Sequence, residues 1–230
     1  MSARSRKFLS PPLLILGLLI IVLAYFLGWS SIFSVKKVEI AGAPTAAVQA
    51  EIEQKSQIEV GQQLARVNPQ SVSRKIEKFS WVKEASISRD WLSGVVDIEI
   101  TPREPLAFFN SDQVPGQTID AEGQLFSLPG YRNPDLALIS AQSPESALKA
   151  NELFTALPEN FRRSITSMMS TSSNTFTLNS TLEGRDIRIR WGDSRDMELK
   201  ISVINSLLNL PENKKIKLID VVAPHAPIVK

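Results

Sequence analysis

An uncharged apolar run near the start of the sequence constrains this chain more than any other feature. Residues 13–29 carry no charged side chain, and a short basic segment with Arg4, Arg6 and Lys7 precedes them. As a helix rising about 1.5 Å per residue, the run spans roughly 26 Å, close to the hydrocarbon thickness of a bilayer. Basic residues favour the cytoplasmic side of a membrane. We therefore predict a cytoplasmic tail at residues 1–12, one transmembrane helix at 13–29 and an extracytoplasmic remainder.

A cleaved signal peptide is the alternative interpretation of this run. The basic tail fits it, and Gly28 and Ser30 are small enough for a cleavage site. The run is longer than the usual apolar core of a signal peptide, however, and bulky Tyr25, Phe26 and Trp29 crowd the cleavage position. A retained anchor is the favoured interpretation.

The composition beyond the run excludes several classes of function. Three of the 26 Lys and Arg residues lie in the tail, which leaves 23 basic residues against 24 acidic ones beyond it. A nearly neutral chain with interspersed charges argues against a nucleic-acid partner, which favours a basic stripe. Because the chain has no cysteine, disulfides, thiolate metal sites and cysteine nucleophiles are excluded.

Residues 33–104 predict a small α+β domain. Val38 and Ile40 alternate with Lys37 and Glu39, the two-residue period of a half-buried strand. The expected order is strand, helix, helix, strand and strand, at residues 35–40, 45–57, 68–79, 81–89 and 95–100. A small sheet with both helices on one face buries the apolar stripe of each helix.

Residues 105–230 predict a mostly antiparallel β domain with flanking helices, beginning after Pro102 and Pro105. Short strands are expected at residues 106–109, 119–126 (two strands around a glycine turn), 136–139, 165–169, 175–178, 187–191 and 216–222. Helices are expected at 145–157 and 197–210, and residues 179–184 read as a turn between two strands. Ile228 and Val229 are interpreted as a continuation of the last strand.

Residues that could support catalysis or bind a metal are few. His225 is the only histidine, flanked by prolines, and nothing resembles the nucleophile elbow of a hydrolase. Asp193, Asp196 and Glu198 are interpreted as a turn and a helix start rather than as metal ligands. We predict no catalytic, cofactor-binding or metal-binding residue, and hence no enzyme.

Two further features concern partners. The final strand lies either at a sheet edge, where another chain could add a strand, or in the centre, and the sequence leaves these alternatives equal. For Trp81 and Trp91, core packing and anchoring of a turn are favoured over contact with a partner.

A series of short motifs runs in order over nearly the whole chain. It comprises Val35, Val38, Ile40, Gly42, Gly61, Trp81, Val82, Arg89, Arg103 and Pro105, followed by Ile119-Asp120 with Gly123 and by Ile219-Asp220-Val221. Behind the expected anchor, this series resembles the FtsQ/DivIB family of bacterial cell-division proteins, in which the first exterior domain is a POTRA domain. The departures are Ser80 and Leu92 in place of prolines, Pro102 in place of an acidic residue, and Val222-Ala223 in place of Arg-Tyr.

The resemblance implies a non-enzymatic divisome scaffold in the cytoplasmic membrane, crossing it once and enriched at the septum. Its implied partners are FtsB/FtsL-type coiled-coil proteins and, indirectly, the septal peptidoglycan synthases FtsW/FtsI; no cofactor is implied. Residues 33–104 would form the POTRA domain and 105–230 the FtsQ-type β domain. The implied partner-binding residues, where a strand is added, are Ile216, Leu218, Ile219, Asp220, Val221, Val222, Ala223, His225 and Ile228, and the helix predicted at 197–210 is implied as a further contact.

A proline substitution in the final strand tests this interpretation. If the final strand is an edge, proline at Val221 or Val222 removes an edge donor and should abolish partner capture with little unfolding. The alternatives are a POTRA-type module for envelope protein assembly or secretion, which usually carries several POTRA copies, and a membrane-anchored exterior enzyme.

Overall fold

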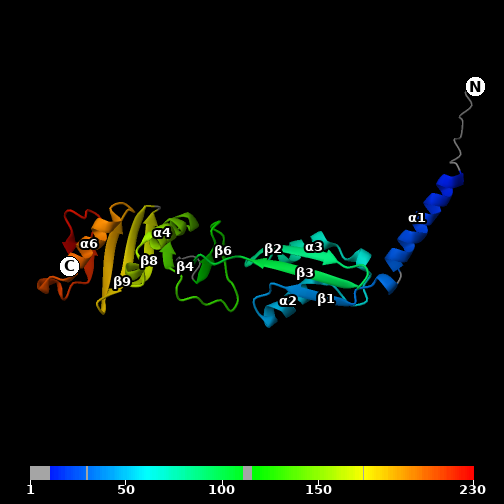
Figure 1. Ribbon diagram of the computed structural model, residues 1–230, viewed down its shortest axis with the longest axis horizontal. Coiled ribbons are helices and arrows are strands. Elements are labelled where there is room, and N and C mark those ends of the chain that lie inside the picture. Colours follow the sequence, from blue (N-terminus) through cyan, green and yellow to red (C-terminus); the bar gives the residue numbers. More distant parts are fainter. Residues whose placement is uncertain (1–10, 30, 111–115, 173) are drawn as a thin grey trace, which may run out of the picture. The chain divides into compact units, whose positions relative to one another are not determined.

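A computed structural model describes residues 11–29, 31–110, 116–172 and 174–230 (Figure 1). The chain divides into two compact units, Met1–Pro102 and Arg103–Lys230. Residues 1–10 of the predicted tail (residues 1–12) lie outside the described residues.

Helix α1 (Pro11–Trp29) forms where the apolar run is predicted to be helical. Several of its large apolar side chains are exposed, among them Ile15, Leu18, Ile21 and Tyr25. Within the part of the chain that the structure describes, no helix has the length and hydropathy of a membrane-spanning segment. The membrane-spanning role of residues 13–29 therefore stays a prediction.

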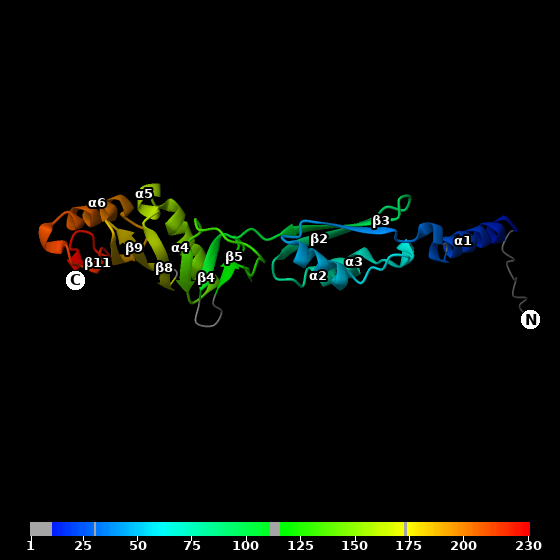
Figure 2. The same ribbon diagram turned by 90° about the horizontal axis from the view of Figure 1, so that it is seen from below.

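The rest of the first unit has the predicted order of strands and helices. Its elements are β1 (Lys37–Ala41), α2 (Ala46–Ser56), α3 (Pro69–Ile76), β2 (Val82–Arg89) and β3 (Val95–Pro102), with short 3₁₀ turns at Ser31–Phe33 and Leu64–Arg66. The central strand β3 runs parallel to β1 and antiparallel to β2. Figure 2 shows α2 and α3 on one face of this sheet, which confirms the predicted α+β arrangement.

Local signals in the sequence explain where the two helices begin. The hydroxyl oxygen of Thr45 accepts a hydrogen bond from the amide of Val48 at 3.3 Å, and the Asn68 side chain accepts one from the amide of Ser71 at 3.1 Å. Each cap satisfies an amide that has no partner within the helix, and Pro69 fits the first helical position because no donor is needed there.

Arg89 holds the loop between the helices against the end of β2. Its guanidinium donates to the carbonyl oxygens of Leu64 at 3.1 Å and Val67 at 2.9 Å, and lies 5.2 Å from the centre of the Trp91 ring. Trp91 packs edge-on against Phe33, with ring centres 6.3 Å apart. Trp81 is a core residue, as predicted.

The second unit is built on one mixed sheet. Within the described residues it has nine strands in the order β12-β11-β10-β9-β8-β7-β4-β5-β6. The strands are β4 (Ala107–Asn110), β5 (Gln117–Ile119), β6 (Leu125–Phe126), β7 (Leu138–Ala141), β8 (Ile165–Ser172), β9 (Thr175–Leu182), β10 (Arg185–Gly192), β11 (Leu218–Asp220) and β12 (Ile228–Val229). Neighbours β4–β7, β7–β8 and β10–β11 are parallel, and the other described pairs are antiparallel.

Helices contribute to a single core on this sheet. They are α4 (Pro144–Ala156), α5 (Glu159–Arg162) and α6 (Met197–Leu208), and a 3₁₀ turn at Pro211–Asn213 follows. Leu153 of α4, Phe161 of α5 and Ile204 of α6 belong to the same buried cluster as Ile189 and Trp191 of β10. Helices on a sheet that is mostly antiparallel again fit the α+β class.

The turn predicted at residues 179–184 is wrong. Strand β9 continues to Leu182, and only Glu183 and Gly184 turn the chain, with φ of 49° and 74°. The polar residues that suggested a turn lie in the strand instead. The side-chain amide of Asn179 donates to the hydroxyl of Ser167 at 2.9 Å, and the hydroxyl of Thr181 donates to the Asp186 carboxylate at 2.8 Å.

The predicted continuation of the final strand through Ile228 and Val229 is also wrong. After β11 the chain turns, with the amide of Ala226 donating to the carbonyl oxygen of Ala223 at 2.9 Å. It then returns as β12, antiparallel to β11. The prolines in this segment cannot donate ladder hydrogen bonds, so they favour a reversal over a longer strand.

Candidate partner-binding edge

The end of the nine-stranded sheet is formed by β10, β11 and β12 of the described residues. Strand β11 runs parallel to β10, with Ile219 beside Ile189, and β12 pairs antiparallel on its other side, with Val229 beside Ile219. For the predicted final strand at residues 216–222 the edge alternative is wrong, because β11 has a neighbour on both sides, and the edge strand is β12.

The backbone of Val229 faces away from β11. Lys230 and Leu218 exchange both of their backbone hydrogen bonds, each at 3.0 Å. In an antiparallel ladder such pairs alternate with pairs that make no hydrogen bond to each other. The neighbouring pair Ile219 and Val229 is of the second kind, so the N–H and C=O of Val229 point outward. Strand β12 therefore presents hydrogen-bonding groups that an added strand can use.

The nine residues implied as partner-binding occupy different environments. Val222 and Ile228 are 50% and 54% exposed, and Ala223 and His225 are exposed as well. Ile216, Leu218 and Asp220 are partly buried. The side chains of Ile219 and Val221 are fully buried in the core cluster. These two residues hold the strand in place, whereas the exposed ones are available to a partner.

The expectation that proline at Val221 removes an edge donor is wrong. The amide of Val221 donates inward, to the carbonyl oxygen of Arg190 at 3.0 Å, and the amide of Val222 donates to the Asp220 carboxylate at 3.1 Å. Proline at either position breaks a hydrogen bond within the fold. The position that tests the edge is Val229.

Asp220 and Gly192 fix the start of the loop between β11 and β12. The Asp220 carboxylate accepts from the amide of Val222 and also pairs with Arg190 at 2.7 Å. Gly192 has a φ of 75°, and a Cβ on it would lie 3.2 Å from the nearest Val222 side-chain carbon. The exposed Val222 side chain is therefore held against the end of β10.

A buried lysine joins β10 to α6 beside this edge. Lys200 is 1% exposed, and its ammonium donates to the carbonyl oxygen of Asp193 at 2.8 Å and to the Asp193 carboxylate at 3.3 Å. The same nitrogen lies 5.4 Å from the centre of the Trp191 ring. Burying a lysine requires such partners, so this contact fixes the chain between β10 and α6.

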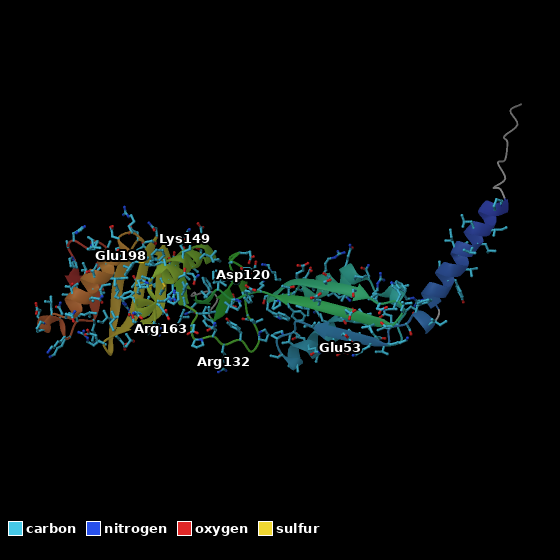
Figure 3. All side chains as sticks on the ribbon, in the orientation of Figure 1. Glu53, Asp120, Arg132, Lys149, Arg163 and Glu198 are labelled. Atoms are coloured by element: carbon cyan, nitrogen blue, oxygen red, sulfur yellow. The ribbon has the colours of Figure 1, made fainter. Side chains whose placement is uncertain are left out.

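The three acidic residues near α6 have the structural roles predicted for them. Asp193 accepts from the amide of Arg195 at 3.1 Å, Asp196 is the N-cap residue of α6, and Glu198 lies in the first turn of that helix (Figure 3). Among the described residues, no group of three or more histidine or acidic side chains is placed to hold a metal ion.

The carboxyl of Asp193 makes the stability of this region depend on pH. Its hydrogen bond from the Arg195 guanidinium is the main reason that its pKa is lowered to about 2, with smaller contributions from the Arg195 amide and Lys200 and an opposing effect of desolvation. A pKa below that of the unfolded chain adds stability above the unfolded value, and this stability is lost as the pH falls through the folded value. We expect Asp193→Asn to lower the urea midpoint at neutral pH, and the difference from the wild type to shrink progressively between about pH 4 and 2. A difference that stays constant over this acid range would contradict the assignment.

The motif residues of the first unit lie mostly inside it. Val35, Trp81 and Val82 are at most 4% exposed, and Val38 and Ile40 are partly buried in β1. Gly42 and Gly61 have φ of 84° and 92°, and Arg89 makes the loop contacts described above. These residues maintain the fold and offer little surface to a partner.

Two motif residues of the second unit meet in space. Arg103 pairs with Asp120 (Figure 3) at 2.7 Å, and Asp120 is 2% exposed. Pro105, next along the motif, lines a groove of about 610 Å³. The two parts of the motif series that contain Arg103 and Asp120 therefore meet in one ion pair.

Comparison with known families matches both units. A family model described as the POTRA domain, FtsQ-type, matches residues 33–103. A second, described as the C-terminal part of the cell division protein FtsQ/DivIB, matches residues 107–221, half of the 230 residues. The chain belongs to the FtsQ/DivIB family. The resemblance drawn from the motif series is thereby confirmed.

A curated relative agrees with this assignment. The cell division protein FtsQ of Salinibacter ruber (strain DSM 13855 / M31) is 27% identical over 120 residues, which cover 50% of this chain and 46% of the relative. The matched part of the chain spans about half the length of that FtsQ protein.

Sequence reasoning missed three residues that shape the edge in this FtsQ/DivIB member, namely Arg190, Gly192 and Lys200. A glycine at the end of an apolar strand is a recognised sign of a bulge or a close approach, so Gly192 offered a signal. Strand β10 does have an irregular register between Arg190 and Gly192. Nothing local marks Lys200 as buried, since lysine on a helix is usually exposed.

Proposed function

We propose that this chain is a non-enzymatic division scaffold, anchored in the cytoplasmic membrane by residues 13–29, with its N-terminus in the cytoplasm and residues 33–230 outside. It is enriched at the division septum, where it binds FtsB/FtsL-type coiled-coil proteins. Through them it helps to regulate septal peptidoglycan synthesis by FtsW/FtsI-type enzymes. Membership in a family of cell-division proteins supports this proposal.

The outward-facing backbone of β12 is the observation that carries the partner-binding part. Strand addition needs an edge with open donors and acceptors, and neighbouring side chains that can give specificity. The backbone of Val229 supplies the first, and the exposed side chains of Val222 and Ile228 supply apolar contacts beside it. The partner segment would extend the sheet by one strand.

The anchor strengthens capture of partners that are themselves in the membrane. The exposed side chains of Ile15, Leu18 and Ile21 on α1 are apolar, which suits contact with lipid. Two proteins confined to the same membrane meet at a raised effective concentration, so modest edge affinity is enough.

Proline at Val229 tests the edge directly. The substitution removes the outward N–H and leaves the hydrogen bonds between Lys230 and Leu218 in place. We expect the affinity for the FtsB/FtsL-type partner to fall about tenfold or more. The urea midpoint should fall only slightly, because the partly buried Val229 side chain loses some packing against the core. Affinity is measured with full-length proteins in vesicles or nanodiscs.

Val229→Thr is the matched control for this variant. Threonine keeps the amide donor and the branched shape of valine, so it should retain the affinity. Normal capture by folded Val229→Pro would rule out strand addition at β12.

A depletion strain tests the division role itself. With a fluorescent tag at Met1, we expect a midcell band before depletion and filaments with otherwise continued growth after it. Expression of Val229→Pro should leave the cells filamentous, whereas Val229→Thr should restore normal length. Normal length after depletion together with uniform envelope fluorescence would overturn the division role and favour an envelope-assembly module.

A further inference from the structure

One end of the first unit carries large apolar side chains that are exposed to solvent. Ile32 and Val60 are each 71% exposed and Leu92 is 91% exposed. They come from three separate segments, before β1, after α2 and between β2 and β3. We name Ile32, Val60 and Leu92 the apolar tip.

Backbone hydrogen bonds tie these three segments together. The amide of Val35 donates to the carbonyl oxygen of Gln62, and that of Gly61 to the carbonyl oxygen of Val35, both at 2.7 Å. The amide of Lys36 donates to the carbonyl oxygen of Gly94 at 2.8 Å. Each residue of the apolar tip is close in sequence to one of these bonds, so the three side chains belong to one end of the domain.

The topology places the same three segments at that end. Strand β1 runs away from it, α2 returns to it, β2 arrives at it and β3 leaves it again, as can be followed in Figure 2. The opposite end holds the connection from Ala41 to Ala46, where α2 begins. The apolar side chains are therefore gathered on one end rather than scattered over the domain.

The turn that carries Leu92 is well defined. The Asp90 carboxylate accepts hydrogen bonds from the amides of Leu92 at 2.8 Å and Ser93 at 3.2 Å, and the amide of Gly94 donates to the carbonyl oxygen of Asp90 at 2.9 Å. These bonds fix the turn while the Leu92 side chain remains outside it. A leucine that is held in an exposed position by a well-defined turn is suited to contact with an apolar surface outside the domain.

The short distance in sequence between the tip and α1 indicates that this apolar surface is the lipid bilayer. Only two residues separate Ile32 from Trp29, the last residue of α1. If α1 is in the membrane, as the proposed function states, the start of the POTRA domain at residue 33 lies at the bilayer surface. The loops bonded to residues 35 and 36 must then lie close to the same surface.

The surroundings of the tip suit the interfacial region of a bilayer. The Trp91 and Phe33 rings pack edge to face, and the Arg89 guanidinium lies over Trp91. The side chain of Lys36 is exposed close by. Aromatic and basic residues around an apolar projection are typical of segments that contact lipid headgroups and the upper acyl chains.

We propose that the apolar tip inserts into the interfacial region of the lipid bilayer and gives the POTRA domain a membrane contact in addition to α1. The contact limits how this domain can tilt on its short connection to the anchor. This inference rests on the proposed membrane anchoring, and its occupant is the lipid surface itself.

Single-cysteine labelling tests the proposal cleanly, because the chain has no cysteine of its own. Val60→Cys and Leu92→Cys are compared with Ala46→Cys, an exposed position at the opposite end of the domain. Each full-length variant carries an environment-sensitive fluorophore and is reconstituted in phosphatidylcholine and phosphatidylglycerol vesicles. Brominated acyl chains then quench a fluorophore that reaches the lipid. We expect quenching at positions 60 and 92 to be severalfold stronger than at position 46.

The outcomes separate this proposal from the anchor. A chain that fails to float with vesicles contradicts the anchor, whereas a chain that floats but shows equal quenching at all three positions contradicts the tip. Blue-shifted emission at position 92 without quenching by brominated lipid indicates a protein partner or a second copy, and also overturns the proposal. In a Leu92→Ser background, quenching at position 60 should decrease, because the tip then enters the bilayer less deeply.

Discussion

Replacing Gly42 by alanine is expected to unfold the first unit. Gly42 has a φ of 84°, and a Cβ on it would lie 1.9 Å from the carbonyl oxygen of Ile100 and 2.9 Å from the carbonyl carbon. These atoms belong to the backbone of the central strand β3, so they cannot move aside as a flexible side chain does. The strain of a positive φ adds to the clash.

Gly61→Ala is the matched control for this variant. Its φ of 92° imposes a similar backbone strain, but a Cβ there would have no atom within 4 Å. We expect a loss of roughly 3 kcal/mol or more for Gly42→Ala and about 1 kcal/mol for Gly61→Ala. The difference between the two measures the clash with β3.

Urea denaturation and hydrogen exchange together check this expectation. Amides of β1 and β3 should lose protection in Gly42→Ala, since these parallel strands depend on the close approach at Gly42. Equal losses for the two glycine variants would mean that the strands separate easily, and that Gly42 is needed only for its backbone angle.

Local patterns were enough to predict most of the elements. Asn68 followed by Pro69 marked the start of α3 because capping needs only the next few residues. The alternation around Val38 and Ile40 marked β1 for the same reason. The order of strands and helices in the first unit followed from such signals alone.

Contacts between distant residues were beyond the reach of these patterns. Asp220 reads as part of a strand motif, but its partner Arg190 lies 30 residues earlier. The return of the chain at β12 depends on a pairing with β11 that no local period reveals. In β9, the successive polar residues 179–181 resembled a turn, but Ser180 is 2% exposed and its hydroxyl donates to the carbonyl oxygen of Ser164 at 3.0 Å, a contact that no local pattern reveals. The sequence therefore pointed to the final segment as a candidate site, but it did not reveal that β12 is the edge strand.

The ion pair between Arg103 and Asp120 is the second place where a large effect is expected. Asp120 is 2% exposed, and one of its carboxylate oxygens lies 2.7 Å from the Arg103 guanidinium. The other accepts from the amides of Glu122 at 3.1 Å and Gln124 at 2.7 Å, which shapes the turn between β5 and β6. Asp120→Ala leaves a charge and two amides without this acceptor. We expect the free energy of unfolding of the second unit to fall by about 3 kcal/mol.

The variant Asp120→Asn distinguishes the contribution of the ion pair from that of the hydrogen bonds in the turn. Asparagine keeps an oxygen that can accept from Glu122 and Gln124, but it cannot pair with Arg103 as a carboxylate does. An intermediate loss of about 1–2 kcal/mol is expected, measured as the urea midpoint of the same unit. If Asp120→Asn is as unstable as Asp120→Ala, the ion pair provides nearly all of the stability. If Asp120→Asn is as stable as the wild type, the hydrogen bonds in the turn provide nearly all of the stability. The ion pair would then not explain why Arg103 and Asp120 occur together in the motif series.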